Sequence, residues 1–371
     1  MITTEEIFTI VNKQLEEDLP FVVYKFPNEN RLGILIQSTN TVYRTRTFEE
    51  QGFVFAPFDS EKEAILLPGS PIYANDFNFD TIVTKQPSSV RASEFEKDSH
   101  IALVEKAIDR IIYSDLQKVV ISRKQKIDKQ DFNALDTFKR LGSKYATAFV
   151  YLWYHPKVGM WLGATPESLL SINGRSFETV ALAGTQRYSS DDIVWGAKEQ
   201  EEQELVTREI ISNLENFKLL NFKRHGIENH RAGDLLHLRT RITGTFSTAE
   251  VSIESLLKAL HPTPAVCGFP REDAKNFIFN NENYTRSFYT GFLGELNILQ
   301  DKSKPRNRRN VENLVYKTLT KSTQLFVNLR CMQYKDQAAH LYIGGGITRD
   351  SNAVNEWEET VNKAQTIASI L

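Results

Sequence analysis

The sequence predicts an α+β fold in which large sheets are faced by helices. The first ninety or so residues contain short apolar runs separated by proline, asparagine and glycine, which is typical of strands. From residue 101 onward, helically spaced apolar residues and continuous apolar strand runs alternate irregularly to the C-terminus. The regular strand–helix spacing of a doubly wound α/β sheet is absent, so the mixture favours the α+β class.

The N-terminal strands are expected at residues 21–24, 32–36 and 52–55. The segment 85–89, with a proline and two serines, is the best linker candidate in the chain. We therefore expect residues 1–95 to form a strand-rich N-terminal part of the same fold. Residues 96–371 are expected to carry the chemistry.

The composition excludes several classes of protein. The chain has 371 residues, of which 41% are hydrophobic and 25% charged, as in soluble globular proteins. The formal net charge of −2 gives no global field for nucleic acid or an acidic membrane surface. The two cysteines, Cys267 and Cys331, lie in apolar stretches and are interpreted as buried thiols. There is no signal-peptide pattern and no apolar run of bilayer length, so we expect a cytoplasmic protein that binds neither nucleic acid nor membrane.

A strongly basic segment at residues 302–309 is the one unusual stretch of composition. We interpret it as a solvated loop between strands, because no aromatic residues are interleaved for stacking on bases. A contact with a phosphate or a partner is the less favoured alternative.

Lys118 directly precedes a continuous apolar run at residues 119–121, which indicates a strand covered on both faces. The helix before it is expected at residues 101–113. Burying an unpaired ammonium is costly, and desolvation favours the neutral amine, which can act as a general base. The alternative is a lysine at the strand end whose amine reaches water. This segment alone favours the alternative.

Glu167 follows small residues and a proline, in a tight turn just ahead of an apolar strand. Such a turn can point a carboxyl group into a cleft, where a raised pKa makes it a proton donor. A glutamate that caps the turn is the alternative, and the segment by itself again favours it.

Three further features could bind a carboxylate. Gly184 and Thr185 offer backbone N–H groups where glycine permits close approach to a ligand, although ordinary turns look the same. Gly344 opens a run of three glycines, which is expected to be flexible and to present N–H groups to an anion. Arg330 is expected on the same strand face as Asn328, where it could clamp a carboxylate or form a surface salt bridge.

The acidic segment 198–206 is expected to be helical, with one inward-facing carboxylate. Val206, Ile210 and Leu214 form a stripe with four-residue spacing, and Glu202 lies one turn before it on the same line. We interpret the other glutamates of the segment as a solvated face.

The C-terminal helix contains two glutamates that belong neither to its apolar stripe nor to its polar face. Glu356 and Glu359 share a third stripe with Lys363 and two isoleucines. Carboxylates in that position need a compensating cation. A hard divalent ion held by Glu356, Glu359 and a third carboxylate such as Glu202 would supply it. The alternative is an internal pair of Lys363 with Glu359 at i, i+4.

In order and content, these segments resemble the chorismate-binding enzymes, a family that includes isochorismate, salicylate, anthranilate and aminodeoxychorismate synthases. The matching segments are LQKVVISR, GATPESLL, LAGTQR, KEQEEQELV, LLHLRTRI, LHPTPAVCGFP, RSFYTGFLGE, VNLRC and GGGITRDSNAVNEWEET. They lie within residues 96–371, and the first ninety-odd residues match only loosely. The resemblance implies two large antiparallel sheets packed together with helices outside, and an active site in a central cleft.

The resemblance also implies roles for individual residues. Lys118 and Glu167 match the catalytic positions. The substrate-binding positions are matched by Gly184, Thr185, His237, Tyr289, Arg330, Gly344 and Lys363. Glu202 and Glu359 resemble ligands of Mg²⁺, with Glu356 nearby and acting through water. The implied substrate is chorismate, and the implied state is a monomer.

Lys118 distinguishes the subfamilies that the resemblance covers. Water must be deprotonated to attack ring carbon C2, and the ammonia-using anthranilate synthases lack this lysine. The segment 181–185 lacks the extra lysine of aminodeoxychorismate synthases. The implied reaction is isochorismate formation, in which Lys118 activates water, Glu167 protonates the departing C4 hydroxyl and magnesium holds the ring carboxylate.

Two alternatives to this reaction stay open. Salicylate synthases share the first step and then eliminate pyruvate, although Ala265 resembles the isochorismate-only type. A non-catalytic chorismate-binding protein is the other alternative, against which the presence of both proton-transfer groups argues. The chain departs from the family pattern at Gln200, Gln203, Thr285, Ser287 and Glu295.

Overall fold

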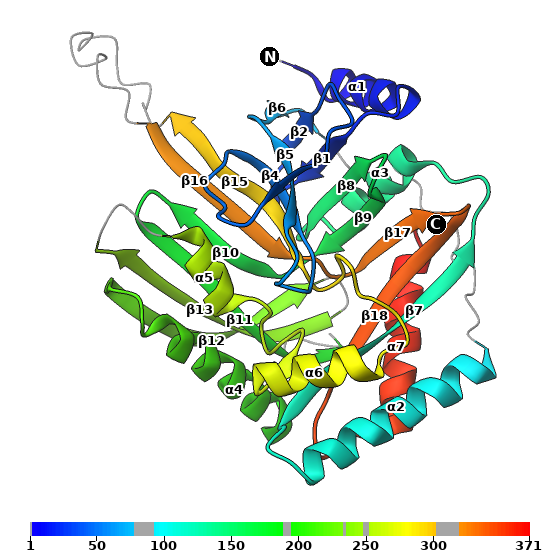
Figure 1. The fold of residues 1–371 in the computed structure, drawn as a ribbon, viewed down its shortest axis with the longest axis vertical. Helices are drawn as coiled ribbons and strands as arrows, with labels where there is room; N and C mark the ends of the chain where they lie inside the picture. The colour runs from blue at the N-terminus through cyan, green and yellow to red at the C-terminus, as the bar shows by residue number, and fades with distance from the viewer. Residues whose placement is uncertain (1, 78–92, 188–193, 233–234, 248–251, 302–318) are drawn as a thin grey trace.

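The computed structural model describes residues 2–77, 93–187, 194–232, 235–247, 252–301 and 319–371. These residues form two nine-stranded antiparallel sheets with helices on their outer faces (Figure 1). The predicted α+β class with two large antiparallel sheets is therefore confirmed. The linker candidate at residues 85–89 and the basic segment at residues 302–309 lie outside the described residues.

The strands of the first sheet, here called sheet A, are in spatial order β14 (Gly268–Phe269), β7 (Lys118–Asp128), β18 (Ala338–Ile347), β17 (Cys331–Lys335), β9 (Gly159–Thr165), β8 (Phe149–His155), β1 (Phe21–Lys25), β2 (Leu32–Ile36) and β6 (Ile72–Ala74). Those of sheet B are β12 (Leu219–Ala232), β13 (Leu235–Phe246), β11 (Ser176–Arg187), β10 (Ser168–Asn173), β16 (Leu319–Val327), β15 (Phe292–Asp301), β4 (Gly52–Ala56), β5 (Ala64–Pro68) and β3 (Tyr43–Thr45). The three expected N-terminal strands are β1, β2 and β4, and they are divided between the two sheets.

The helices cover the outer faces of both sheets. Those packed on sheet A are α1 (Thr4–Glu16), α3 (Ala134–Lys144) and α7 (Ala353–Ala368), and those on sheet B are α4 (Ala197–Leu214) and α5 (Ile253–Leu260). The helices around β7 are α2 (Glu94–Ile112) and α6 (Arg271–Asn281). Helix α1 was not expected from the strand-rich start; Thr3 and Glu6 begin it with a capping box. None of the helices in the described ranges is long and apolar enough to cross a membrane.

A buried aromatic core holds the two sheets together. Strand β8 shows how the sequence produces it: Phe149, Tyr151 and Trp153 point into the space between the sheets, while Val150 and Leu152 point to the helices. Both faces of this strand are buried, so its sequence reads as a continuous hydrophobic run. The period-2 alternation separates aromatic from aliphatic residues.

Two of the short crossovers between the sheets carry predicted site residues. Strand β9 of sheet A leads into β10 of sheet B through Pro166 and Glu167, and β16 of sheet B leads into β17 of sheet A through residues 328–330. The crossovers are hydrogen-bonded into one unit, because Val327 N donates to Glu167 O over 2.9 Å and Ala164 N donates to Arg330 O over 3.2 Å.

Asn328 fastens the second crossover to the core. It is fully buried, its Nδ2 donates to Phe288 O over 2.9 Å, and its Oδ1 accepts from Tyr151 Oη over 2.6 Å. We predict that Asn328→Ala lowers the free energy of unfolding by about 2–4 kcal/mol, because it leaves two buried polar groups without these bonds. Urea unfolding followed by tryptophan fluorescence measures this change. Asn355→Ala, on the exposed face of α7, is the control, and equal midpoints for both variants would contradict the prediction.

Candidate functional site

A cavity of about 290 Å³ lies between the β7–β18 end of sheet A, strands β11 and β13 of sheet B, and helices α4 and α7. All but one of the predicted site residues line it. They are Lys118, Glu167, Gly184, Glu202, His237, Tyr289, Arg330, Gly344, Glu356, Glu359 and Lys363. Thr185 lies beside Gly184 on β11, and its side chain is outside the described part of the structure.

Lys118 enters the cavity from the first position of β7. Its side chain is 3% exposed, so the expectation that its amine reaches water is wrong. The Nζ atom donates to Glu202 Oε1 over 2.5 Å. A desolvated ammonium needs such a partner, and the pair joins sheet A to helix α4.

Helix α4 places Glu202 as the sequence stripe predicted. Val206, Ile210 and Leu214 are buried against sheet B, and Glu202, one turn earlier, lines the cavity. The interpretation of the other glutamates as a solvated face is wrong for Glu199, which also lines the cavity. Glu199 and Glu202 are three residues apart on α4, as Glu356 and Glu359 are on α7. This repeated spacing could have identified Glu199 as a cavity residue from the sequence.

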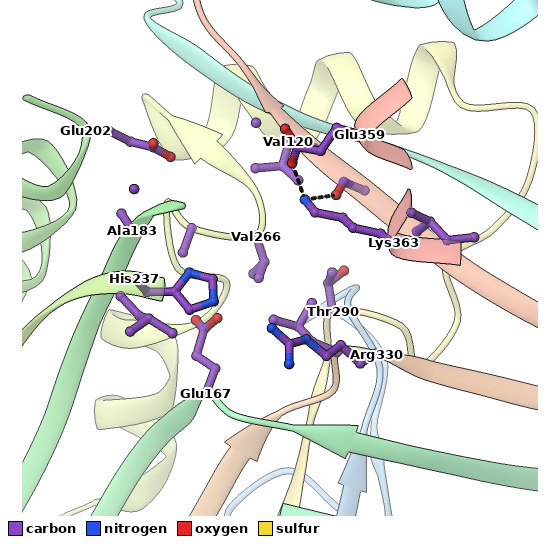
Figure 2. Close-up of a pocket in the computed structure, with 18 of the residues that line it drawn as sticks. Val120, Glu167, Ala183, Glu202, His237, Val266, Thr290, Arg330, Glu359 and Lys363 are labelled. Carbon is purple, nitrogen blue, oxygen red and sulfur yellow. Dashed lines mark hydrogen bonds and ion pairs between the residues drawn. The ribbon is translucent and has the colours of Figure 1, made fainter. Parts of the chain in front are cut away.

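Helix α7 contributes two carboxylates and one ammonium. Glu356 is buried, while the Glu359 side chain is 47% exposed. Lys363 Nζ donates to Glu359 Oε1 over 2.5 Å and to Gly344 O over 2.9 Å (Figure 2). The internal pair considered as an alternative for Lys363 is therefore formed, and it ties the helix to β18.

The first crossover points Glu167 into the cavity. The residue is 5% exposed, and burial raises the pKa of its carboxyl to about 7, although Lys118 and Arg330 lower it in part. Figure 2 shows Glu167, His237 and Arg330 pointing into the same part of the cavity. Burial, with the nearby arginine, lowers the pKa of His237 to about 3, so its ring is neutral near pH 7.

Arg330 reaches the cavity by a different route from the predicted one. Strand alternation does not set its direction, because β16 ends at Val327 and Arg330 lies in the crossover with a φ of 46°. A non-glycine residue in that region is uncommon and is held there by its surroundings. Nothing local in the largely apolar segment 325–332 marks this change of sheet.

The three glycines are strand residues, so the expectation of a flexible run is wrong. Gly344, Gly345 and Gly346 lie within β18 and pair with β7. Their role is to leave room: a Cβ at Gly344 would lie 2.7 Å from Tyr289 Oη, and one at Gly346 would lie 3.0 Å from Lys118 Cε. Side chains of other elements therefore reach the strand backbone here.

Gly184 has a backbone conformation that favours glycine. It lies at a register shift between β11 and β13, with a φ of 68°. A Cβ there would lie 3.1 Å from Glu199 Cβ. The bulge thus brings the strand backbone close to helix α4 at the cavity wall.

An aromatic stack forms another wall of the cavity. Tyr289 stacks on Tyr342 with ring centroids 5.4 Å apart, and Tyr342 stacks on Trp161 at 5.2 Å. Tyr342 lines the cavity but was not identified from the sequence, because its strand pattern is that of an ordinary core residue. The stack gives the cavity an apolar wall, whereas other residues that line the cavity are charged.

Two models of chorismate binding enzymes match this chain, one over residues 74–301 and one over residues 314–369. The first match alone covers more than half of the 371 residues. The chain belongs to the chorismate binding enzyme family.

Individual relatives show the same likeness. The isochorismate synthase MenF of Haemophilus influenzae is 25% identical over 277 residues, 72% of this chain, which thus spans only 59% of that protein. The vibriobactin-specific isochorismate synthase of Vibrio cholerae is 26% identical over 328 residues, which are 85% of this chain and 78% of that protein. The solved structure of MenF, the menaquinone-specific isochorismate synthase from Escherichia coli, matches with a TM-score of 0.77 at 20% identity, over 95% of this chain and 88% of the other. At that identity the structural match shows the fold.

Two departures from the family pattern have a structural explanation in this chain. The buried Nε2 of Gln203 donates to Ala181 O and Thr240 Oγ1, each over 3.1 Å, so Gln203 links α4 to sheet B. Glu295 is buried between two tyrosines, Tyr24 and Tyr73, whose hydroxyls both donate to it. Burial raises the pKa of Glu295, although these hydrogen bonds lower it in part.

The raised pKa of Glu167 predicts a pH-dependent cost to stability. The folded protein holds the Glu167 proton up to about pH 7, whereas the ordinary pKa of a glutamate, which applies to the unfolded chain, is 4.5. The contribution of Glu167 to the free energy of unfolding is therefore full below about pH 4.5. It is lost as the pH rises from there through about 7. We predict that Glu167→Gln gains stability relative to the original chain over this window, measured by urea unfolding at pH 5, 6, 7 and 8. A difference independent of pH would contradict this prediction.

Proposed function

We propose that this chain is an isochorismate synthase, which converts chorismate to isochorismate by adding water at C2 and losing the C4 hydroxyl. The observation that supports it most is one cavity that is lined by both a buried lysine, Lys118, and a buried glutamate of raised pKa, Glu167. The reaction needs one group that takes a proton and one that donates a proton. The names of the relatives from Haemophilus and Vibrio agree with this reaction.

Glu167 is the proposed general acid. A carboxyl group with a pKa of about 7 is protonated in a large fraction of molecules near neutral pH, and it can give that proton to the leaving hydroxyl. Lys118 is the proposed base that takes a proton from water. In the structure its amine is ion-paired with Glu202, so the base role requires Glu202 to turn to another cation.

Chorismate carries two carboxylates, and the cavity offers cations for both. Arg330 lies beside Glu167, and its guanidinium can bind a carboxylate with two parallel hydrogen bonds. Lys363 lies at the α7 side. Neutral His237 can donate a hydrogen bond to a substrate oxygen without adding charge. The Tyr289 and Tyr342 rings give the substrate ring an apolar surface.

Magnesium is part of the proposal. The glutamates that line the cavity, Glu199 and Glu202 on α4 and Glu356 and Glu359 on α7, are the hard oxygen donors that this ion prefers. As placed, no three acidic, histidine or cysteine groups among the described residues converge on one point. Glu202 and Glu359 are paired with lysines instead, so an ion would compete with two ammonium groups. When bound, the ion would neutralise and orient a substrate carboxylate.

Salicylate synthesis is the second candidate, because it shares the first step. The side chain that favours plain isochorismate formation is Ala265, a small apolar residue in the cavity wall. It provides no polar group beside the substrate for the additional elimination of pyruvate.

The decisive experiment is product analysis by chromatography after incubation with chorismate and magnesium. We predict isochorismate as the product, and a rate at least about 100-fold lower for Lys118→Ala, which removes the proposed base. Lys126→Ala is the matched control, since Lys126 is an exposed lysine on the same strand, and its rate should be unchanged. Salicylate with pyruvate as main products would favour the second candidate, and no turnover of chorismate would overturn both.

The metal proposal makes a separate prediction. Isothermal titration with MgCl₂ should detect binding, and Glu202→Gln should weaken it by at least about tenfold, since loss of even an outer partner of a metal costs that much. Glu201→Gln, an exposed neighbour on α4, should bind as the original chain does. Equal affinities for the two variants would show that Glu202 is not a ligand.

A further inference from the structure

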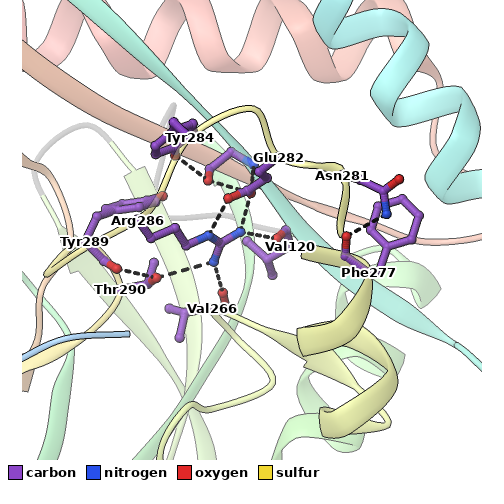
Figure 3. A network of polar contacts seen from close by, with 10 residues as sticks. Val120, Val266, Phe277, Asn281, Glu282, Tyr284, Arg286, Tyr289 and Thr290 are labelled. Carbon is purple, nitrogen blue, oxygen red and sulfur yellow. Dashed lines mark hydrogen bonds and ion pairs between the residues drawn. The ribbon is translucent and has the colours of Figure 1, made fainter. Parts of the chain in front are cut away.

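The cavity is backed by a buried ion pair that the proposed reaction does not use (Figure 3). Arg286 Nη2 donates to Glu282 Oε1 over 2.6 Å, and Arg286 Nε donates to Glu282 Oε2 over 2.8 Å. Both side chains are 2% exposed. Burial lowers the pKa of Arg286, but Glu282, Tyr284 and Tyr289 together raise it by more, so the net pKa lies above its ordinary value and the guanidinium stays charged.

The remaining donors of Arg286 hold three separate segments of the cavity wall. Nη2 also donates to Val120 O on β7 over 2.6 Å, and Nη1 donates to Val266 O over 3.0 Å and to Thr290 Oγ1 over 3.3 Å. Val120, Val266 and Thr290 all line the cavity. One guanidinium group therefore sets the spacing of a strand, a loop and a turn around the substrate space.

Glu282 extends the same network to the glycine strand. It accepts hydrogen bonds from Ser122 N over 2.8 Å and from Ser122 Oγ over 2.7 Å, and Ser122 pairs with Gly344 in the β7–β18 ladder. Ser122 lies four residues after Lys118 on the same strand. The ion pair thus contacts the strand that carries the proposed base and borders the one that carries Gly344.

The turn held by Arg286 is in an unfavourable backbone conformation. Ser287 has a φ of 53° and Thr290 a φ of 58°. A β-branched residue with such a positive φ is a genuine outlier. Thr290 keeps this backbone conformation because contacts with its surroundings hold it. Besides Arg286, His261 Nε2 lies 3.0 Å from Thr290 O, and Thr290 N donates to Asn328 O over 2.9 Å. The turn presents Tyr289 to the cavity.

We infer that Arg286 and Glu282 are positioning residues for the reaction, which hold Tyr289, Val266 and strand β7 in the geometry that the substrate needs. This inference rests on the proposed function for its kinetic part. The pair touches no substrate atom in this scheme and acts through the wall residues. A displacement of about 1 Å in such a wall can lower a rate about 100-fold.

The test uses the full chain with Arg286→Lys and Glu282→Gln. A lysine keeps the charge but cannot reproduce a two-point contact with Glu282 together with two carbonyl contacts. The controls are Arg224→Lys and Glu204→Gln, since Arg224 and Glu204 form the same forked pair at the surface, away from the cavity. Each variant is measured for kcat, KM, the Kd of chorismate by calorimetry and its unfolding midpoint.

We expect the Arg286 and Glu282 variants to lose about 10- to 100-fold in kcat while folded, with weaker chorismate binding, and the controls to stay within twofold. A purely structural role would lower the unfolding midpoint alone. Folded Arg286→Lys protein with kcat and Kd within twofold of the original chain would overturn the inference.

A milder variant keeps the inference testable if Arg286→Lys fails to fold. Ser122→Ala removes the hydroxyl contacts to Glu282 and to Tyr284 Oη and leaves the fork intact. We expect it to lower kcat several-fold, and unchanged kcat and Kd would then overturn the inference. If the original chain forms no isochorismate, the proposed function fails, and the chorismate Kd of the variants still decides the role of the pair.

Discussion

The structure of the site depends on two strand crossovers that are hydrogen-bonded to each other. Because Glu167 O and Arg330 O each accept a backbone N–H group of the strand that leads into the other crossover, the two residues are held in one place between the sheets. Their side chains then enter the same cavity. The two sheets cover the crossovers and exclude water from the Glu167 carboxyl. This burial raises the pKa of Glu167.

The second half of the site is built from opposite charges on different elements. Lys118 of sheet A meets Glu202 of α4, and Lys363 meets Glu359 within α7. In these two pairs each charge has a partner without any ligand, as the cost of burying charge requires. In the proposed reaction, the dianionic substrate and a divalent ion take over these partners together. The pairs thereby preserve a charged cavity in the free protein, ready for an ionic substrate.

Much of the fold and part of the site could be predicted from the sequence. The stripe of Val206, Ile210 and Leu214 indicated how α4 packs and therefore where Glu202 points, because helical periodicity is local. The short apolar runs and the turn residues between them located β1, β2 and β4. The tight turn at Glu167 was also visible, although only the structure shows that it joins two sheets.

The failures share a physical reason, which is that tertiary partners decided them. The glycines from Gly344 to Gly346 look like a flexible run, but they form a ladder with β7, and side chains of other elements fill the space. Arg330 lies in an apolar run whose strand ends early, and nothing local marks the change of sheet. Glu199 resembles its solvated neighbours in sequence, and the structure places it on the cavity wall beside the bulge at Gly184.

The measurement that tests the central claim most directly is the origin of the new hydroxyl group. The reaction is run in water enriched in ¹⁸O, and the product is examined by mass spectrometry. If Lys118 activates water for attack at C2, isochorismate carries one ¹⁸O atom in its new hydroxyl. Isochorismate without label would mean that the hydroxyl moves within the substrate, and it would contradict the role assigned to the lysine.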